Sequence, residues 1–226
     1  MYRLDSPMTP VTITRQGAGY HERTPEQAFP SSTAIRSYYA QTGCLPEQGI
    51  PETIRTLLQK YPDRFPMTED DLSDMLYYKL RTMDDAALSI CDMTPELWKR
   101  MQHQLPHYQT PSQFVDLIKT KGYTQTRIQR VLLHLLLDLY STTQSACYAR
   151  LLGFRQRHSD LLRTQTNIPV LTKVADAATQ LTTAPAKEQW QADLRAHDLY
   201  RYLLLQKHPN ARLADDYHAG LSILPA

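Results

Sequence analysis

Glycine is scarce in this chain: only 7 of its 226 residues are glycine, against 15 prolines. Proteins rich in β-structure, and α/β proteins, use glycine in tight turns and phosphate-binding loops, so the shortage favours helices and argues against complete dinucleotide-binding machinery. Hydrophobic residues make up 42% of the chain, which is enough for a buried core. The composition predicts one large domain, or a smaller domain with an appendage.

Cysteine is rarer still, with three residues in the chain. Cys44, Cys91 and Cys147 are odd in number, widely spaced and in no C-x-x-C pair, which argues against both a disulfide framework and a thiolate metal site. We interpret all three as ordinary buried thiols. His103 and His107 are four residues apart, but a proline between them breaks the helix and no H-E-x-x-H pattern is present. The sequence therefore predicts no metal site.

Long apolar runs are absent as well. The run over residues 131–137 is interrupted by His134 and is far shorter than the roughly 20 residues that cross a bilayer. The first 14 residues lack the cationic segment and apolar stretch of a secretory signal. We therefore expect a cytoplasmic protein that has no membrane partner.

The net charge of +2 conceals an uneven distribution. Residues 119–163 contain eight Lys or Arg and two Asp, a local charge of +6, which leaves −4 for the remainder. A concentrated positive field attracts polyanions even when the whole molecule is nearly neutral. This segment predicts an RNA or other polyanionic partner, and the alternative is a solvated helical face that is basic by chance.

Helix-start signals follow a single candidate strand at residues 11–15. Three Thr-Pro pairs, at residues 24, 94 and 110, place a hydroxyl at an N-cap and proline at the first helical position. With apolar periodicity, they predict helices near 33–42, 51–60, 69–81, 84–91, 95–104, 111–120, 125–140, 144–152, 156–164 and 188–206. We expect a mobile loop at 182–186 and a loosely held tail at 212–226. The predicted fold class is mainly α: an irregular helical bundle with a short β-strand segment at the N-terminus.

A hydroxyl cluster opens the first of these helices. The segment Ser-Ser-Thr-Ala-Ile-Arg, residues 31–36, places an Arg within the first turns. The N-terminus of a helix offers unpaired N–H groups and a partial positive charge, so it suits a phosphate, and hydroxyls with a guanidinium complete the cradle. The alternative is that the hydroxyls only cap the helix.

A second cluster lies in the basic segment. On a helix that starts after Tyr123, one stripe is apolar, whereas Arg127, Arg130 and His134 recur at spacings of three and four on another face. Tyr123 could stack on an unpaired base, as sequence-specific RNA recognition often requires. The segment predicts a surface that contacts RNA, and the alternative is a surface helix with a core tyrosine.

The order of several motifs is specific. The segments are Pro10–Arg15 with Tyr20–Glu22, Ser31–Arg36, Leu76–Leu80, Lys119–Arg130 and Tyr148–Phe154. Together they resemble the C-terminal half of the tRNA(Met) cytidine acetate ligase family, and Ser31–Arg36 resembles the second ATP-binding signature of H-x-G-H nucleotidyltransferases. The resemblance implies an ATP-dependent ligase that activates acetate as acetyl adenylate, with Mg²⁺ accompanying the ATP. It then acetylates the wobble cytidine of elongator tRNA(Met).

The resemblance also assigns roles to residues. Those that it places at ATP are Arg15, Gln16, Ser31, Ser32 and Arg36. Those in the basic segment, which the physical argument assigns to tRNA, are Lys119, Lys121, Tyr123, Arg127 and Arg130.

One family signature is missing, because no H-x-G-H occurs in the sequence. We therefore interpret residues 1–43 as a remnant of the nucleotidyltransferase domain and residues 44–226 as a helical, tRNA-binding C-terminal domain. The catalytic residues would then belong to a missing or separate N-terminal domain, and the isolated chain would be inactive. The alternative is a non-catalytic helical module that binds RNA or protein.

Overall fold

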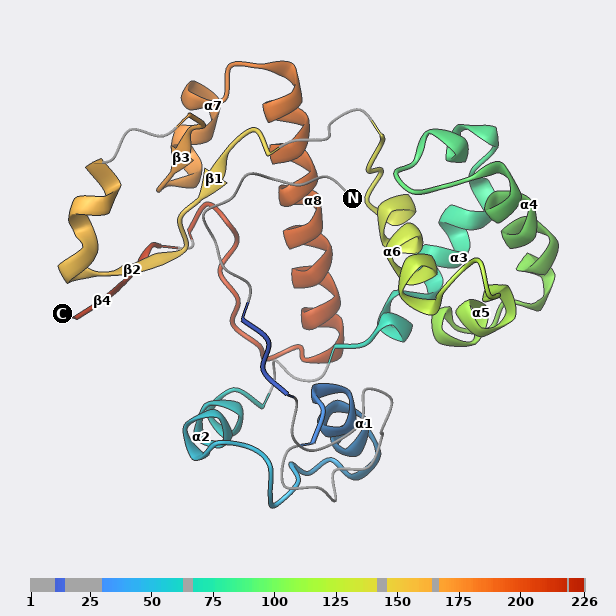
Figure 1. The fold of residues 1–226 in the computed structure, drawn as a ribbon, viewed down its shortest axis with the longest axis horizontal. Coiled ribbons are helices and arrows are strands. Elements are labelled where there is room, and N and C mark those ends of the chain that lie inside the picture. The colour runs from blue at the N-terminus through green and yellow to red at the C-terminus, as the bar shows by residue number, and fades with distance from the viewer. Residues whose placement is uncertain are drawn as a thin grey trace. The chain divides into compact units, whose positions relative to one another are not determined.

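A computed structural model describes residues 11–14, 30–62, 67–141, 146–163, 167–218 and 220–225 (Figure 1). The chain divides into two compact units, residues 1–66 and residues 67–226. The sequence predicts a different division, between residues 43 and 44, which separates an ATP-binding part from a tRNA-binding part. That division of roles stays a prediction.

The first unit contains two described helices, α1 (Ser32–Thr42) and α2 (Glu52–Lys60). The Ser31 hydroxyl accepts a hydrogen bond from the Ala34 amide at 3.1 Å and so caps the start of α1. The helix ends at Gly43, whose φ of 70° is a left-handed conformation that glycine adopts without steric cost. Both helices lie within two residues of their predicted bounds.

The second unit begins with a cluster of helices. Three of its helix starts are capped by threonine hydroxyls, at Thr94, Thr110 and Thr124, each of which accepts from an amide three residues on. The elements of the cluster are η2 (Glu69–Leu72), α3 (Ser73–Thr82), η3 (Asp85–Ser89), α4 (Pro95–Gln104), η4 (Leu105–His107), α5 (Pro111–Ile118) and α6 (Gln125–Leu136). The Thr-Pro signals at 94 and 110 thus predicted both helix starts correctly.

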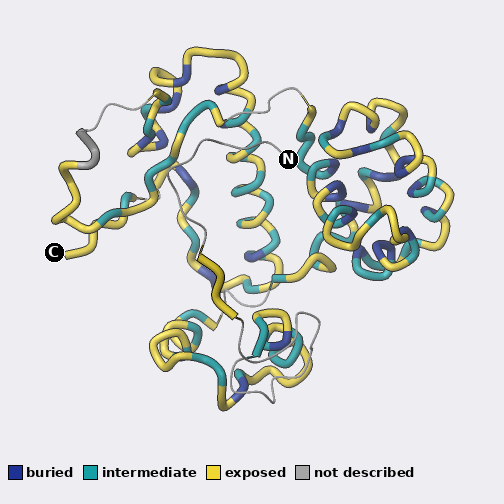
Figure 2. Tube along the Cα trace, viewed as in Figure 1, coloured by how far each residue is buried: buried dark blue, intermediate teal, exposed yellow. Residues whose placement is uncertain are grey.

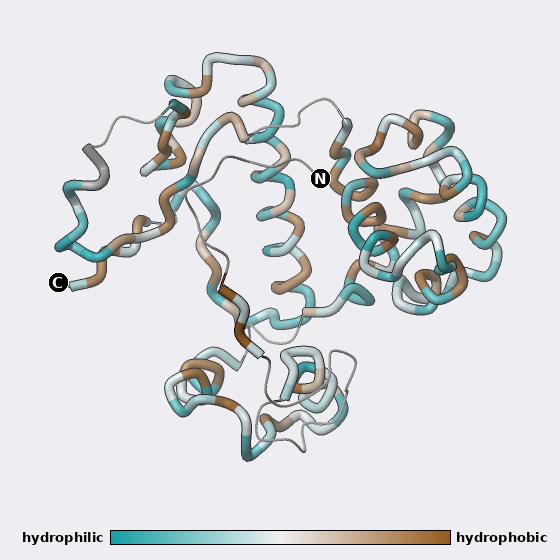
Figure 3. The backbone as a smooth tube through the Cα atoms, in the orientation of Figure 1, coloured by the Kyte–Doolittle hydropathy of each residue, from teal (hydrophilic) through white to brown (hydrophobic). Residues whose placement is uncertain are grey.

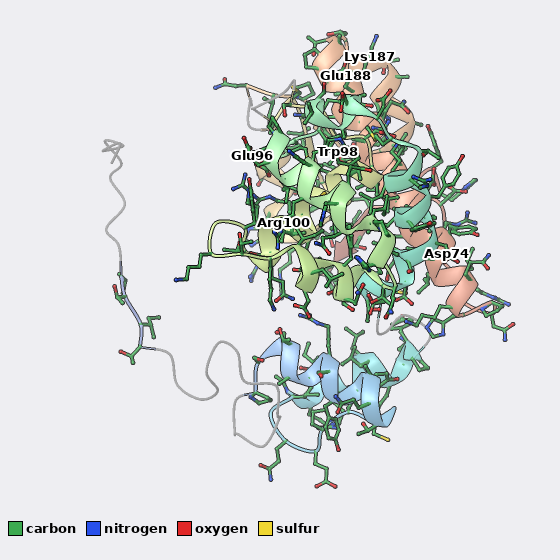
Figure 4. The ribbon with its side chains drawn as sticks, turned by 90° about the vertical axis from the view of Figure 1, so that its right-hand side faces the viewer. Asp74, Glu96, Trp98, Arg100, Lys187 and Glu188 are labelled. Atoms are coloured by element: carbon green, nitrogen blue, oxygen red, sulfur yellow. The ribbon has the colours of Figure 1, made fainter. Side chains whose placement is uncertain are left out.

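The core of this cluster lies among α3, α4, α5 and α6, where buried and hydrophobic stretches of the chain coincide (Figures 2 and 3). Phe114 is fully buried, and its ring lies 5.1 Å from that of Tyr108. Arg100, labelled in Figure 4, belongs to α4. Its guanidinium donates to the carbonyls of Leu117 and Ile118 at the end of α5. Arg100 therefore satisfies helix-end carbonyls that have no partner within α5.

Short strands and one long helix follow. β1 (Ala149–Arg150) pairs in parallel with β3 (Val170–Leu171), and β2 (Gly153–Arg155) pairs in parallel with β4 (Ser222–Leu224). The helical elements here are η5 (Gln156–Arg163), η6 (Val174–Asp176), α7 (Ala177–Gln180) and α8 (Ala184–Lys207). We call β1 to β4 together with α7 the strand region.

The 24-residue helix α8 lies between the helical cluster and the strand region (Figure 1). Near its end, the Lys207 ammonium lies 2.9 Å from the Asp71 carboxylate. In its middle, Arg195 donates to the Leu137 carbonyl at 3.1 Å. In its first half, the Trp190 ring packs edge-on against Tyr148, with centroids 5.8 Å apart. Polar contacts thus attach α8 to the cluster, and an aromatic contact joins it to the strand region.

The predicted mainly α bundle with one N-terminal strand segment is wrong, because the described strands lie between residues 149 and 224. The helix predicted over 144–152 contains β1, and the tail predicted to be loosely held contains β4, which pairs with β2. These strands have two or three residues each and pair with segments 21 or 69 residues away. Strands this short have no alternating pattern that a sequence could reveal.

Three smaller predictions also differ from the structure or are only partly described by it. The loop predicted at 182–186 is the start of α8, capped by Thr183. Cys44 is exposed, so the interpretation of all three cysteines as buried thiols is wrong. The described residues 11–14 of the first predicted strand carry no strand assignment, and Arg15 lies outside the described residues.

Among the described helices, none is both long enough and apolar enough to span a membrane.

Candidate functional site

The N-terminus of α1 is the part of the predicted ATP site that the structure describes. Ser31 is the N-cap and Ser32 is the first helical residue, so the amides of residues 32 and 33 have no acceptor within the helix. Ser32 and Thr33 are exposed. The Ser31 oxygen accepts from the Ala34 amide. This end of α1 therefore presents several donors to solvent.

Arg36 is exposed one turn further along α1, with no ion pair to any described residue. A guanidinium that has no carboxylate partner can bind a phosphate without first breaking an ion pair. Arg15 and Gln16, the other two residues predicted to contact ATP, lie outside the described residues.

The predicted tRNA-binding residues lie on the loop 119–124 and on α6. The apolar stripe of α6 is buried, with Ile128 and Leu135 inaccessible to solvent. Arg130 is exposed and Arg127 is half-buried, so the two faces of this helix separate as the spacing predicted. Lys121 is exposed on the preceding loop.

Tyr123 connects this loop to the helical cluster. Its hydroxyl lies 3.0 Å from the hydroxyl of Thr94, the residue that caps α4, and its ring packs against the core. The Arg127 guanidinium lies over the Tyr123 ring, 5.1 Å from its centroid, in a cation–π arrangement. Because these contacts occupy the ring, the geometry favours Tyr123 as the residue that positions Arg127.

Two of the predicted cations already have carboxylate partners. Arg130 Nε lies 2.7 Å from Asp92 Oδ2, and Lys119 Nζ lies 2.6 Å from Asp116 Oδ1. All four side chains are more than a third exposed, and exposed pairs of this kind contribute about 1 kcal/mol or less. A phosphate can therefore replace either carboxylate at small cost.

A second polar network, in the strand region, has no signal in the sequence. Arg150 forms two hydrogen bonds to Asp216, at 2.8 and 3.0 Å, and the carboxylate is 5% exposed. These bonds raise the pKa of Arg150. Burial raises the pKa of the Tyr148 phenol, and its hydrogen bond to Asp193 raises it further. Each pair joins β1 or the residue before it to a distant segment, so this network stabilises the fold.

A cavity of about 510 Å³ lies between α6 and α8. Its lining is largely leucine, with Leu133, Leu136 and Leu137 on one side and Leu199 and Leu203 on the other. A triphosphate needs convergent cationic or amide donors, which this lining does not offer. The cavity is therefore unsuited to the phosphates of a nucleotide.

The family model described as HIGH nucleotidyl transferase matches residues 1–216. The chain therefore belongs to the HIGH nucleotidyl transferase family.

Within that family, similarity is found to enzymes named tRNA(Met) cytidine acetate ligase. The one from Clostridium tetani is 29% identical over an alignment of 188 residues, and the match covers 77% of this chain and 46% of that protein. The one from Listeria monocytogenes serotype 4a is 30% identical over 213 residues, 92% of this chain and 51% of that protein. The chain spans about half the length of the curated relatives it matches.

Two solved structures share the fold. The crystal structure of Thermotoga maritima TmcAL without ligand matches with a TM-score of 0.78 and 21% identity, over 95% of this chain and 55% of that one. The form bound with alpha-thio ATP matches with a TM-score of 0.75 and 22% identity, over 88% of this chain and 53% of that one.

These matches correct the predicted placement of the chain. The interpretation as a C-terminal half that lacks the nucleotidyl transferase domain is wrong, because the family match begins at residue 1 and continues to residue 216. The likeness to a nucleotidyl transferase structure over 95% of the chain likewise contradicts an all-α bundle. The missing partner domain and the predicted inactivity both rested on that placement, so neither is carried further.

Proposed function

We propose that this chain acts in the ATP-dependent acetylation of a tRNA cytidine, with the N-terminus of α1 at the ATP phosphates and the loop 119–124 with α6 at the tRNA. In this reaction, acetate attacks the α-phosphorus of ATP to form acetyl adenylate and release pyrophosphate. The exocyclic amine of the wobble cytidine of elongator tRNA(Met) then attacks the acetyl carbonyl, and AMP leaves. A tRNA-modifying enzyme of this kind works in the cytoplasm.

The single observation that carries the tRNA part of the proposal is the separation of the two faces of α6. One face is buried in the cluster core, and the other presents Arg127 and Arg130 beside the exposed Lys121. Cations spaced along one helix face can contact successive phosphates of an RNA backbone. The names of the relatives support tRNA(Met) as the RNA concerned.

The donors at the start of α1 support the ATP part. The exposed hydroxyl of Ser32, the first-turn amides and the exposed Arg36 suit the negative charge of a triphosphate. The Mg²⁺ that we propose to accompany ATP would be carried by the nucleotide's own phosphates.

The tRNA assignment is tested by titration of the chain with elongator tRNA(Met) and with a tRNA of another anticodon, each at several salt concentrations. Arg127→Ala combined with Arg130→Ala should weaken binding and lower the slope of log affinity against log salt by about 2, because each phosphate contact releases counterions. Arg81→Ala serves as the control, because Arg81 is an exposed arginine on α3.

Preference for elongator tRNA(Met) would support a recognition surface in this chain, whereas equal binding would leave it with electrostatic contacts only. If the double variant binds as tightly as the unaltered chain, the assignment of this face is wrong. If neither tRNA binds, the non-catalytic interaction module predicted as the alternative is favoured.

The ATP assignment is tested by calorimetry with ATP and Mg²⁺. Arg36→Ala should weaken ATP binding by about tenfold, the effect of losing one charge-assisted hydrogen bond. Lys60→Ala, an exposed cation on α2, should leave it unchanged. Equal ATP affinity of the Arg36 variant and the unaltered chain would contradict the assignment.

A further inference from the structure

The loop between η3 and α4 is fixed against the segment that follows α6. The Cys91 amide donates to the Leu139 carbonyl at 2.8 Å, and Ile90 and Tyr140 form an antiparallel bridge. Asp92 has a φ of 65°, a left-handed conformation that turns the chain sharply towards α4. These contacts place residues 91 and 92 beside α6, on the side where Arg130 and His134 lie one turn apart.

Three potential metal ligands meet there. One ligand atom from each of Cys91, Asp92 and His134 lies within 4.8 Å of the other two. Donor atoms on a tetrahedral zinc ion lie about 3.5 Å apart, given the usual Zn–S and Zn–N bond lengths. The side chains therefore need to approach one another by roughly 1 Å to share one ion, which side-chain rotation can supply.

The groups around these ligands resemble the outer shell of a metal site. His134 Nδ1 lies 3.0 Å from the Cys91 carbonyl oxygen. In the tautomer that carries its proton on Nδ1, this nitrogen donates to the carbonyl and Nε2 keeps the lone pair for a metal. The alternative ligand atom is Nδ1 itself, 3.9 Å from Asp92 Oδ2, which would exchange the carbonyl for the metal. Arg130 donates to Asp92 Oδ2 at 2.7 Å, and a carboxylate can accept from arginine through one oxygen while the other binds a cation.

We propose that Cys91, Asp92 and His134 form a binding site for one Zn²⁺ ion. A thiolate, a carboxylate and an imidazole are all zinc ligands, and the mixture of soft and hard donors suits zinc better than magnesium or calcium. Cys91 and His134 are partly buried, whereas Asp92 is exposed, so water can occupy the fourth position. On binding, the Cys91 thiol loses its proton to solvent and its sulfur bonds to the metal.

The predicted absence of a metal site rested on linear spacing. Cys91 and His134 are 43 residues apart and belong to no recognised ligand pattern, so only the fold brings them together. The proposal depends on this geometry. It shares Arg130 with the proposed tRNA surface but does not rest on the tRNA or ATP roles.

The test is a titration of the reduced full chain with Co²⁺, followed by displacement with Zn²⁺. One equivalent of Co²⁺ should produce a thiolate-to-cobalt charge-transfer band and the visible bands of a tetrahedral ion, and Zn²⁺ should abolish both. Cys91→Ser should remove the charge-transfer band. His134→Gln should weaken binding by more than about tenfold, the smallest effect seen even for loss of an outer partner.

Matched controls are Cys147→Ser, a partly buried cysteine, and His103→Gln, an exposed histidine. Both should bind Co²⁺ as the unaltered chain does. A second measurement needs no variant: Zn²⁺ should slow alkylation of Cys91 by iodoacetamide, followed by mass spectrometry, and leave the alkylation of Cys44 unchanged. No charge-transfer band in the unaltered chain, a band that survives Cys91→Ser, or no protection of Cys91 would each overturn the proposal.

Discussion

The helical cluster and the strand region are held together by different interactions. In the cluster, sixteen of the described residues form one continuous apolar core. Where the strand region packs against the start of α8, the corresponding core has six, and charged and polar pairs such as Arg150 with Asp216 supply further connections. The difference teaches that one unit can combine a region stabilised by burial with a region stabilised by long-range polar contacts.

The largest expected effects come from substitutions that leave a cavity in each of the two cores. Phe114→Ala should lower the free energy of unfolding of the second unit by about 4 kcal/mol, because a fully buried ring is lost from a continuous core. Leu171→Ala, in the smaller core, should cost about 2 kcal/mol, because its surroundings can relax into the gap. Urea denaturation measures both. An equal or larger cost at Leu171 would break the comparison.

Removal of a buried charge tests the strand region next. Asp216→Ala should cost about 2 kcal/mol, because Arg150 then keeps its charge in a half-buried position without its partner. The neighbouring Asp215→Ala is the control. Asp215 pairs with His218 at the surface, where water screens the pair and its contribution to stability is small. Equal effects in urea denaturation would show that the Arg150 pair is no more important than a surface pair.

Two helices that start with a threonine cap can be compared, one in the cluster and one that packs against the strand region. Thr94→Ala, at the start of α4, should cost about 1.5 kcal/mol, because both the cap and the hydrogen bond with Tyr123 are lost. Thr183→Ala, at the start of α8, should cost about 1 kcal/mol, because the cap alone is lost. Thermal unfolding of the two variants decides the order, and Thr→Ser at each site should restore most of the loss.

The smallest expected effect concerns the end of α8. Burial raises the pKa of Asp71. The hydrogen bonds from Lys207 and Thr68 together lower the pKa by more than burial raises it, so the pKa lies below its ordinary value. The stabilisation is therefore complete above the unfolded pKa of about 3.9 and is lost as pH falls through the lower folded value.

Lys207→Ala should cost less than about 1 kcal/mol at pH 7, and the cost should shrink when denaturation is repeated near pH 3. Lys99→Ala, an exposed lysine on α4, is the control at both pH values. A cost that is the same at both pH values would exclude the Asp71 carboxylate as its source.

The part of the fold that the sequence predicted is the part governed by local signals. Thr-Pro pairs and apolar periodicity marked α4, α5 and most of α6, because caps and buried stripes are encoded within one helix. The parallel pairs were missed, because the pairing of Gly153 with Ser222 depends on the whole intervening chain. A turn of the chain at Asp138, with φ of 53°, also ended α6 earlier than its apolar pattern suggested.

The candidate sites divide in the same way. The capped start of α1 and the basic face of α6 were both visible as spacings. Their partners were not, because Asp92 and Asp116 reach Arg130 and Lys119 through space, and because Tyr123 contacts Thr94 across 29 residues. The sequence identified the cations but could not tell which of them already had a partner.

The two left-handed aspartates have a consequence for which residues can occupy these positions. Asp92 and Asp138 each combine a positive φ with an ion pair, to Arg130 and to Lys79 respectively. Glycine would satisfy the backbone but lose the charge, and glutamate would keep the charge but strain the backbone. Asparagine would retain the turn and a neutral hydrogen bond. The choice of side chain at both positions is therefore restricted twice over, and asparagine should destabilise the fold less than glutamate at either position.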